Sequence, residues 1–186
     1  IIGLKQNCQI CYNFKMGKSN VCTIYLVRHA LSVANLTGIM GGNSPLADQG
    51  KIQAIELGKK FKDIDFAAVF SSHKKRAMQT AKLIIEGRDL SVQTVHGLRE
   101  RSFGSLDLKT SSEYRSLFEA LKDMSDDEVW KWKIVDDMET AQDAVERFSN
   151  ALEEIAKAYL GKKVLVVGHG TVNRSFLVKI GYGSFK

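Results

Sequence analysis

The chain has 186 residues, 44% hydrophobic and 26% charged, which is typical of one soluble globular domain with a sizeable core. The formal net charge of +6 does not by itself indicate a nucleic-acid partner. Half of this excess positive charge lies at Lys5, Lys15 and Lys18. The other basic residues are interleaved with acids instead of forming a basic patch. We therefore expect no nucleic-acid binding.

Residues 1–20 are predicted to form an N-terminal extension outside the fold, followed by one domain over residues 21–186. The first methionine is Met16, and the first apolar strand begins only near Val21. The opening residues are too short and too often interrupted for a signal peptide or a membrane span. Cys8 and Cys11 form one isolated pair, whereas a structural zinc site needs about four ligands. The expectation is a reduced, cytoplasmic protein with no metal site and no membrane association.

The first half of the chain alternates strands and helices. Residues 22–29 form an apolar run that ends in Arg28 and His29, and a glycine-rich loop over residues 37–42 follows. Asp48 is predicted to cap a helix whose Ala54, Leu57, Gly58 and Phe61 share one face. Residues 66–70 form a second strand, which leads through a Ser-Ser pair into a helix over residues 73–86.

The second half continues the alternation. A third strand is predicted over residues 91–95, and residues 110–132 are helical in composition but irregular. The clearest helical period runs over residues 140–160, where an apolar stripe indicates core packing. The last strand ends at His169, and Gly170 opens a final helix that runs to about residue 180. This order predicts an α/β fold, a mostly parallel central sheet flanked by helices on both faces.

The carboxyl ends of parallel strands meet at one edge of the sheet, where ligands of α/β proteins bind. Polar groups follow four of the predicted strands at that edge: Arg28 with His29, residues 71–76, Arg99 with Glu100, and His169. Guanidinium groups that converge with two imidazoles form a pocket for a compact dianion, and a phosphate monoester fits best. The helices that open after Ser72 and His169 would add backbone N–H groups.

Glu100 indicates chemistry beyond binding. A neutral histidine is a competent nucleophile toward phosphorus, and a nearby carboxyl group can protonate the leaving oxygen and then activate water. A lone histidine after a strand is more often structural, so the prediction rests on the joint placement of these groups. His73 and His96 have no such partners, and we expect ordinary surface residues there.

Five ordered blocks over residues 22–175 resemble the histidine phosphatase superfamily, whose fold is called phosphoglycerate mutase-like. Residues 26–35 resemble its Arg-His-Gly motif with the downstream asparagine, and residues 45–54 resemble the next block. Residues 71–81 match its Ser-Ser-x-x-x-Arg-Ala-x-Gln-Thr-Ala block. Residues 98–104 resemble the acid-bearing block, and residues 168–170 the last one.

The resemblance implies a role for each matching residue. It implies that His29 is the phosphorylated nucleophile, that Glu100 is the proton donor and that no cofactor or metal takes part. The phosphate ligands that it implies are Arg28, Asn35, Arg76, the catalytic His169 and Gly170.

The sequence departs from the family pattern at three places. Ala30 replaces the usual glycine of the first motif, and Leu106-Asp107-Leu108 stands where the family often has Trp-Glu-Gly. The sequence stops at Lys186, whereas relatives usually continue through another strand, and the loss of that strand would leave one sheet edge uncovered.

The predicted function is a phosphatase that hydrolyses small-molecule phosphate monoesters, similar to the bacterial broad-specificity and α-ribazole phosphatases. Mutases of this family use a proline-containing insertion between the acid and the last histidine, and that interval contains no proline here. A phosphoglycerate mutase is the alternative among enzymes. The alternative of another class is an inactive phosphate-ester-binding or scaffold protein. The sequence does not indicate the physiological substrate or the oligomeric state.

Overall fold

A single sheet organises the chain. The computed structural model describes residues 9–16 and 20–185. In this part the sheet has five strands in the order β1-β2-β5-β3-β4. The strands are β1 (Gln9–Met16), β2 (Asn20–Arg28), β3 (Ala68–Ser71), β4 (Val92–Thr94) and β5 (Lys163–Gly168). β1 is antiparallel to β2, and the other pairs are parallel, which confirms the predicted mostly parallel sheet.

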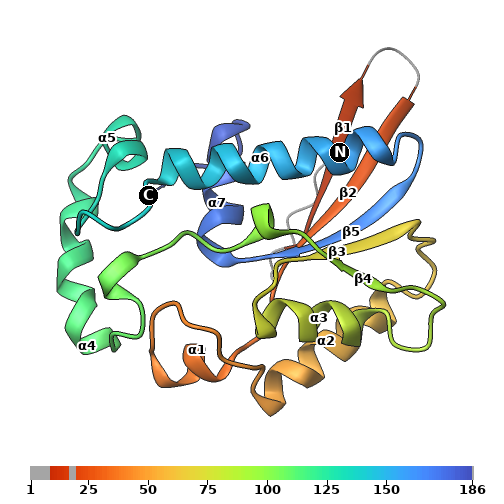
Figure 1. The fold of residues 1–186 in the computed structure, drawn as a ribbon, viewed down its shortest axis with the longest axis horizontal. Coiled ribbons are helices and arrows are strands. Elements are labelled where there is room, and N and C mark those ends of the chain that lie inside the picture. The colour runs from red at the N-terminus through yellow and green to blue at the C-terminus, as the bar shows by residue number, and fades with distance from the viewer. Residues whose placement is uncertain (1–8, 17–19, 186) are drawn as a thin grey trace.

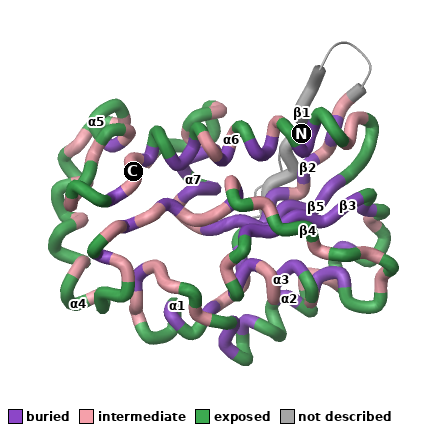
Figure 2. Tube along the Cα trace, viewed as in Figure 1, coloured by how far each residue is buried: buried purple, intermediate pink, exposed green. Residues whose placement is uncertain are grey.

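Helices cover both faces of this sheet (Figure 1). On one face lie α6 (Ala141–Ala158) and α7 (Gly170–Lys179), and on the other lie α2 (Asp48–Lys60) and α3 (Lys75–Ile84). Because side chains alternate along a strand, β5 contributes Val164 and Val166 to one core and Leu165 and Val167 to the other. The burial pattern in Figure 2 follows this arrangement, with the sheet buried between the helix layers.

The spacing of apolar residues predicted both the position of α6 and its buried face. Val145, Phe148, Leu152 and Ile155 of its predicted stripe are buried, and the last three lie in one core cluster with side chains of β2 and β5. Thr140 begins the helix as its N-cap, and its hydroxyl accepts a hydrogen bond from the Asp143 N–H at 3.0 Å. The interpretation of this stripe as core packing is confirmed.

α2 and α3 pack against each other beneath the sheet. The N-cap of α2 is Ala47, so Asp48 is the first helical residue instead of the predicted cap. A Cβ on Gly58 of α2 would come within 2.8 Å of the Ile84 carbonyl oxygen on α3. The absence of a side chain at position 58 therefore lets the two helices approach closely.

Short helices lie beyond the carboxyl ends of β2 and β5 (Figure 1). They are α1 (Val33–Thr37), η1 (His96–Leu98), η2 (Gly104–Leu106), α4 (Ser111–Tyr114), η3 (Arg115–Lys122) and α5 (Asp126–Lys131). The irregular stretch predicted over residues 110–132 is thus three short helical pieces. A small core of Met40, Phe103, Leu106 and Met138 holds this region together.

β1 occupies the outer edge of β2. Its residues 9–16 belong to the segment that the sequence placed outside the fold, yet the backbone pairs from Gln9↔Val27 to Met16↔Asn20. The outer edge of β2 is therefore paired. Residues 1–8 and 17–19 lie outside the described part of the chain, as does the Cys8 thiol. Across residues 9–16 and 20–185, helices long and apolar enough to cross a membrane are absent.

Candidate active site

The register of the parallel strands brings the predicted polar residues to one level of the sheet. Arg28 is opposite Gly168, and Ser71 is opposite Val167. The His29 N–H donates to the Gly168 carbonyl oxygen at 3.0 Å, so β2 and β5 remain in register to the last residue. His29 and His169 consequently lie side by side, with ring centroids 5.2 Å apart.

His29 is buried and has a fixed tautomer. Its Nδ1 lies 2.8 Å from the Ala30 carbonyl oxygen, which can only accept, so Nδ1 carries the proton. Nε2 in turn accepts a hydrogen bond from Arg76 Nε at 3.1 Å. Burial, together with the charges of Arg76 and Arg28, lowers the pKa of His29 to about 3 despite the bond to Ala30. The imidazole is therefore neutral at physiological pH, with its basic lone pair on Nε2.

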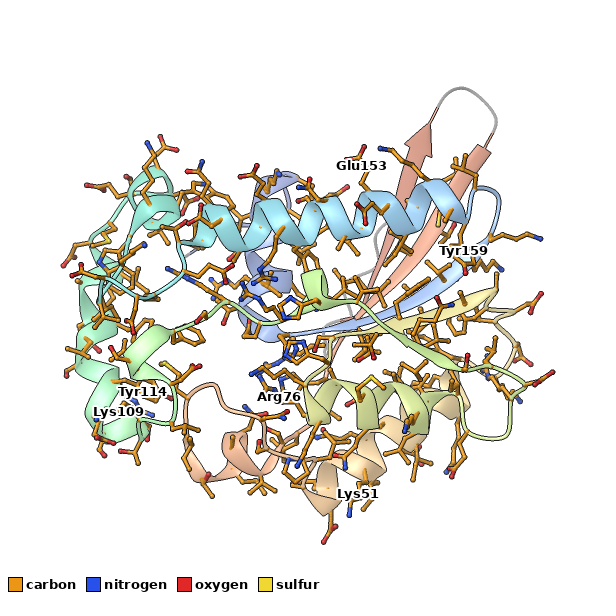
Figure 3. All side chains as sticks on the ribbon, in the orientation of Figure 1. Lys51, Arg76, Lys109, Tyr114, Glu153 and Tyr159 are labelled. Atoms are coloured by element: carbon orange, nitrogen blue, oxygen red, sulfur yellow. The ribbon has the colours of Figure 1, made fainter. Side chains whose placement is uncertain are left out.

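Arg76 lies at the start of α3 and points toward the carboxyl edge of the sheet (Figure 3). Besides His29, its guanidinium donates from Nη1 to the Gly42 carbonyl oxygen at 3.0 Å. Gly42 belongs to the predicted glycine-rich loop and has a φ of 64°, a left-handed conformation that favours glycine. Burial lowers the pKa of Arg76, while the charges of Glu100 and Asp107 oppose that effect.

His169 is completely buried and has one unsatisfied ring nitrogen. Its Nε2 lies 2.6 Å from Ser72 Oγ, and that hydroxyl already accepts the Lys74 N–H at 3.3 Å. A hydroxyl has one proton and two acceptor lone pairs, so this contact is satisfied by either tautomer of His169. Within the described chain Nδ1 has no hydrogen-bond partner. Buried polar atoms are normally satisfied, so this unpartnered ring nitrogen beside His29 marks a place for a ligand atom.

Arg28 and Gly170 form a second close contact between the strand ends. A Cβ at position 170 would lie 2.9 Å from Arg28 Nε and 3.0 Å from Cζ. Glycine therefore leaves room for the guanidinium beside the first residue of α7. The side-chain amide oxygen of Asn35, Oδ1, belongs to the capping box of α1, where it accepts hydrogen bonds from the Ser32 N–H and hydroxyl.

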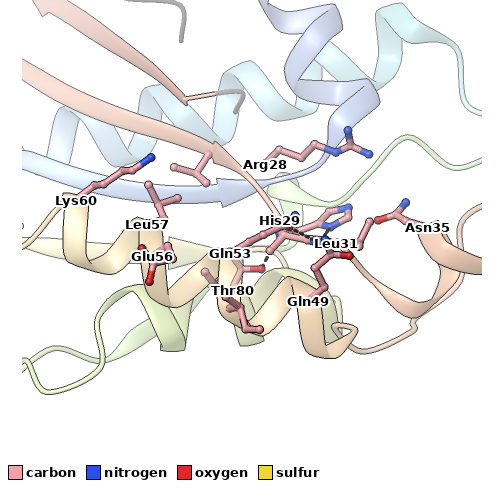
Figure 4. A pocket seen from close by; sticks show the side chains of 14 residues that line it. Arg28, His29, Leu31, Asn35, Gln49, Gln53, Glu56, Leu57, Lys60 and Thr80 are labelled. Carbon is pink, nitrogen blue, oxygen red and sulfur yellow. Dashed lines mark hydrogen bonds between the residues drawn. The ribbon is translucent and has the colours of Figure 1, made fainter. Parts of the chain in front are cut away.

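A cavity of about 590 Å³ runs along α2 from the end of β2 (Figure 4). Arg28, His29 and Asn35 line one end of it, and Leu57 and Lys60 line the other. A second cavity of about 260 Å³ is lined by Arg76, Glu100 and Asp107. Arg28, His29, Asn35 and Arg76 thus lie where two cavities meet the strand ends.

Glu100 is held by the N-terminus of α7. Its two carboxylate oxygens accept from the backbone N–H groups of Arg101, Thr171 and Val172 at 2.9–3.0 Å. We expected the N–H groups at the start of α7 to bind a phosphate. Some of them bind this carboxylate instead. The contact in turn fixes Glu100 at the wall of the smaller cavity, next to Arg76.

A partly buried acid that the sequence did not reveal holds the Glu100 loop. Glu139 accepts from both Arg99 and Arg147, each through two nitrogens at 2.8–3.0 Å. Burial alone would raise the pKa of Glu139, but hydrogen bonds from Arg147, Ser102 and Arg99 lower it to about 2. Arg147 also donates to the Glu100 carbonyl oxygen at 3.1 Å.

This network corrects the role of Arg99, which we expected to converge on the site. Its guanidinium is engaged by Glu139 instead. No local sequence pattern marks such a contact, because the two residues lie 40 positions apart in the chain.

His73 and His96 are exposed, as predicted, but they are not without partners. Their rings stack with centroids 4.8 Å apart and planes inclined by 7°. Both rings line the smaller cavity together with Glu100. The surface pair therefore belongs to the surroundings of the candidate site.

Comparisons with known proteins agree with this arrangement. The family model of the histidine phosphatase superfamily (branch 1) matches residues 24–183. An uncharacterized phosphatase, PhoE, from Bacillus subtilis is 32% identical over 162 residues, covering 86% of this chain and 78% of that protein. A metal-independent phosphoserine phosphatase from Arabidopsis thaliana is 32% identical, covering 90% of this chain and 72% of that protein.

Solved structures show the same similarity. A phosphoglycerate mutase from Bacillus anthracis superposes with a TM-score of 0.76 at 27% identity, covering 88% of this chain and 81% of that one. The matched region spans both histidine-bearing strand ends and the arginine between them. This chain belongs to the histidine phosphatase superfamily, as its motifs indicated.

Proposed function

We propose that the protein hydrolyses small phosphate monoesters through a phosphohistidine intermediate on His29, with Glu100 as general acid and base. The observation that carries the proposal is the state of His29. Its Nε2 is unprotonated, and the guanidinium of Arg76 donates to it at 3.1 Å. A neutral nucleophile beside fixed positive charge suits attack on a dianion.

In the first step the Nε2–phosphorus bond forms while the bond from phosphorus to the leaving oxygen breaks. Arg28, Arg76, the Asn35 amide, the Gly170 backbone and His169 Nδ1–H bind the phosphoryl oxygens, and Glu100 gives its proton to the leaving oxygen. In the second step water attacks phosphorus, the Nε2–phosphorus bond breaks, and the Glu100 carboxylate takes the proton from water. The arginines supply the charge neutralisation that the transferred group requires.

The first test concerns His29. With p-nitrophenyl phosphate we expect turnover in the wild-type protein and a loss of roughly 10³-fold or more in His29→Ala, because the nucleophile is removed. Rapid quenching with a labelled phosphodonor should yield an acid-labile protein adduct that is absent from the variant. Unchanged turnover in His29→Ala would contradict the proposal.

The second test concerns Glu100. Alkyl phosphates have poor leaving groups that need a proton, so Glu100→Gln should reduce their turnover by about 10²–10⁴-fold. p-Nitrophenolate leaves without a proton and should be affected far less. Since Glu100 also binds the N-terminus of α7, the thermal unfolding midpoint of the variant should be measured in parallel. An equal loss of turnover for alkyl phosphates and for p-nitrophenyl phosphate would contradict the role of Glu100 as general acid.

Two alternatives make different predictions. A phosphoglycerate mutase would convert 3-phosphoglycerate to 2-phosphoglycerate in the presence of bisphosphoglycerate. The relatives named as phosphatases favour hydrolysis over this reaction. An inactive binding protein would bind vanadate yet release no phosphate from any monoester tested.

A further inference from the structure

The smaller cavity, of about 260 Å³, is lined by two chemically different sets of groups. Arg76 and Glu100 belong to the candidate site described above, and the other set is Lys74 with the exposed imidazoles of His73 and His96. Since Glu100 must reach the leaving oxygen and lines this cavity, the leaving group extends into it. Ligand pockets commonly measure about 300–1,000 Å³, so this cavity fits only a small leaving group.

Most of the charged groups in this cavity are already engaged. Arg99 is bound to Glu139, and the guanidinium of buried Arg101 donates to the backbone carbonyl oxygens of Glu139 and Trp132 at 2.7 and 2.8 Å. Arg76 is surrounded by His29, the Gly42 carbonyl oxygen and two carboxyl groups. These three arginines therefore have little capacity for a further ligand beyond the phosphate itself.

Lys74 is the exception. It lies two residues before Arg76, lines the cavity and forms no ion pair with any described residue. The Asp107 carboxyl group lines the same cavity and attracts Lys74, but the two groups are not within ion-pair distance of each other. The Lys74 ammonium group is therefore available to an incoming anion.

The stacked imidazoles next to Lys74 add hydrogen-bond donors. Burial and the neighbouring charges of His96, Lys74 and Arg99 lower the pKa of His73. A neutral imidazole still presents one N–H group. Within the described residues neither ring has a hydrogen-bond partner, and stacking at 4.8 Å fixes both rings at the cavity wall.

We propose that Lys74, His73 and His96 bind a second anionic group on the substrate, a carboxylate or another phosphate, which lies on the leaving group. The inference rests on the proposed function and names its substrate class: small phosphate monoesters with two anionic groups. An ammonium group and two N–H donors match such an anion through charge-assisted hydrogen bonds.

The test uses substrates that differ by one charge. O-phosphoserine and O-phosphoethanolamine differ only in a carboxylate, and fructose 1,6-bisphosphate and fructose 6-phosphate differ in a second phosphate. We expect kcat/KM to favour the doubly anionic member of at least one pair. In Lys74→Gln this preference should fall about ten-fold, since one hydrogen bond between charged groups is lost. Lys74→Arg should restore most of it.

Lys75→Gln is the matched control, because Lys75 is exposed on the same turn and does not line the cavity. It should leave both the preference and the turnover of p-nitrophenyl phosphate unchanged. Which pair responds to Lys74→Gln shows whether the second group is a carboxylate or a phosphate. No preference in the wild-type protein, or an equal loss for every substrate in Lys74→Gln, would overturn the inference.

A binding measurement keeps this test separate from the proposed function. In a His29→Ala background, which should not consume substrate, calorimetry should give a Kd ratio for the pair that shows the preference, and Lys74→Gln should reduce this ratio by the same factor. Absence of p-nitrophenyl phosphate turnover in the wild-type protein contradicts the hydrolysis proposal alone. An unchanged Kd ratio contradicts the second anion site alone.

Discussion

Leu108 has a left-handed backbone, with a φ of 72°, the only such value outside glycine in the described chain. It stands where the family often has the glycine of Trp-Glu-Gly. Left-handed backbone costs a residue with a Cβ roughly 1–2 kcal/mol. Because the side chain is 68% exposed, little packing offsets that cost.

Leu108→Gly should therefore stabilise the protein by about 0.5–1 kcal/mol, after the larger backbone entropy loss of glycine is subtracted. Urea unfolding at neutral pH measures the difference. Leu117→Gly is the matched control, since Leu117 lies exposed in η3, and glycine there should destabilise by about 1 kcal/mol. A destabilised Leu108→Gly would refute strain at this position.

The residues of the candidate site differ in how far the sequence reveals them. His29 and His169 follow apolar strands, and Arg76 follows the Ser-Ser pair, so strand ends and motifs locate them. Glu139 was not predicted, because its contacts with Arg99 and Arg147 connect separate loops and helices. The stacking of His73 on His96 depends in the same way on how α3 and η1 are placed.

At the scale of elements, Gly58 lets α2 pack closely against α3. Helix propensity alone predicts that Gly58→Ala stabilises α2 by about 1 kcal/mol. Contact with the Ile84 carbonyl oxygen, 2.8 Å from the new Cβ, predicts the opposite sign, since overpacking costs typically about 1–3 kcal/mol.

We expect packing to prevail and Gly58→Ala to lose about 1 kcal/mol or more in urea unfolding. Lys59→Ala, one residue farther along α2 and exposed, should change stability by less than about 0.5 kcal/mol. A more stable Gly58→Ala would show that the two helices separate freely.

The long periodic elements and the parallel strands were predicted correctly, whereas the short helix α1 and the edge strand β1 were not. The apolar stripe of α6 and the apolar runs of β2 and β5 are enough to locate these three elements in the sequence. α1 has only five residues and depends on its Ser32–Asn35 capping box, so it leaves no apolar period. β1 lacks a continuous apolar run, and its pairing with β2 is a contact between strands that composition does not reveal.

At the scale of the whole molecule, two buried histidines and one partly buried acid should make stability fall on acidification. The pKa of His29 is lowered from 6.5 to about 3, mainly by burial, so below pH 6.5 the unfolded chain binds a proton that the folded chain does not. His169 acts with the same sign. Glu139, lowered from 4.5 to about 2, loses its stabilising charge as pH falls through that interval.

Between pH 6.5 and 5.0, His29 alone should account for about 2 kcal/mol of lost stability. Urea unfolding of wild-type protein and His29→Asn at several pH values measures this contribution. Between pH 6.5 and 5.0 the free energy of unfolding of the variant should fall by about 2 kcal/mol less than that of the wild-type protein. Parallel curves would show that His29 titrates alike in the folded and unfolded chains.

The hydrogen bond from Arg76 Nε to His29 Nε2 has a chemical consequence for the resting protein. In the proposed mechanism the phosphate of the substrate must therefore draw this guanidinium away before the lone pair on Nε2 can attack phosphorus. An electrophile without negative charge would not compete for the guanidinium, so we expect such a reagent to modify His29 slowly.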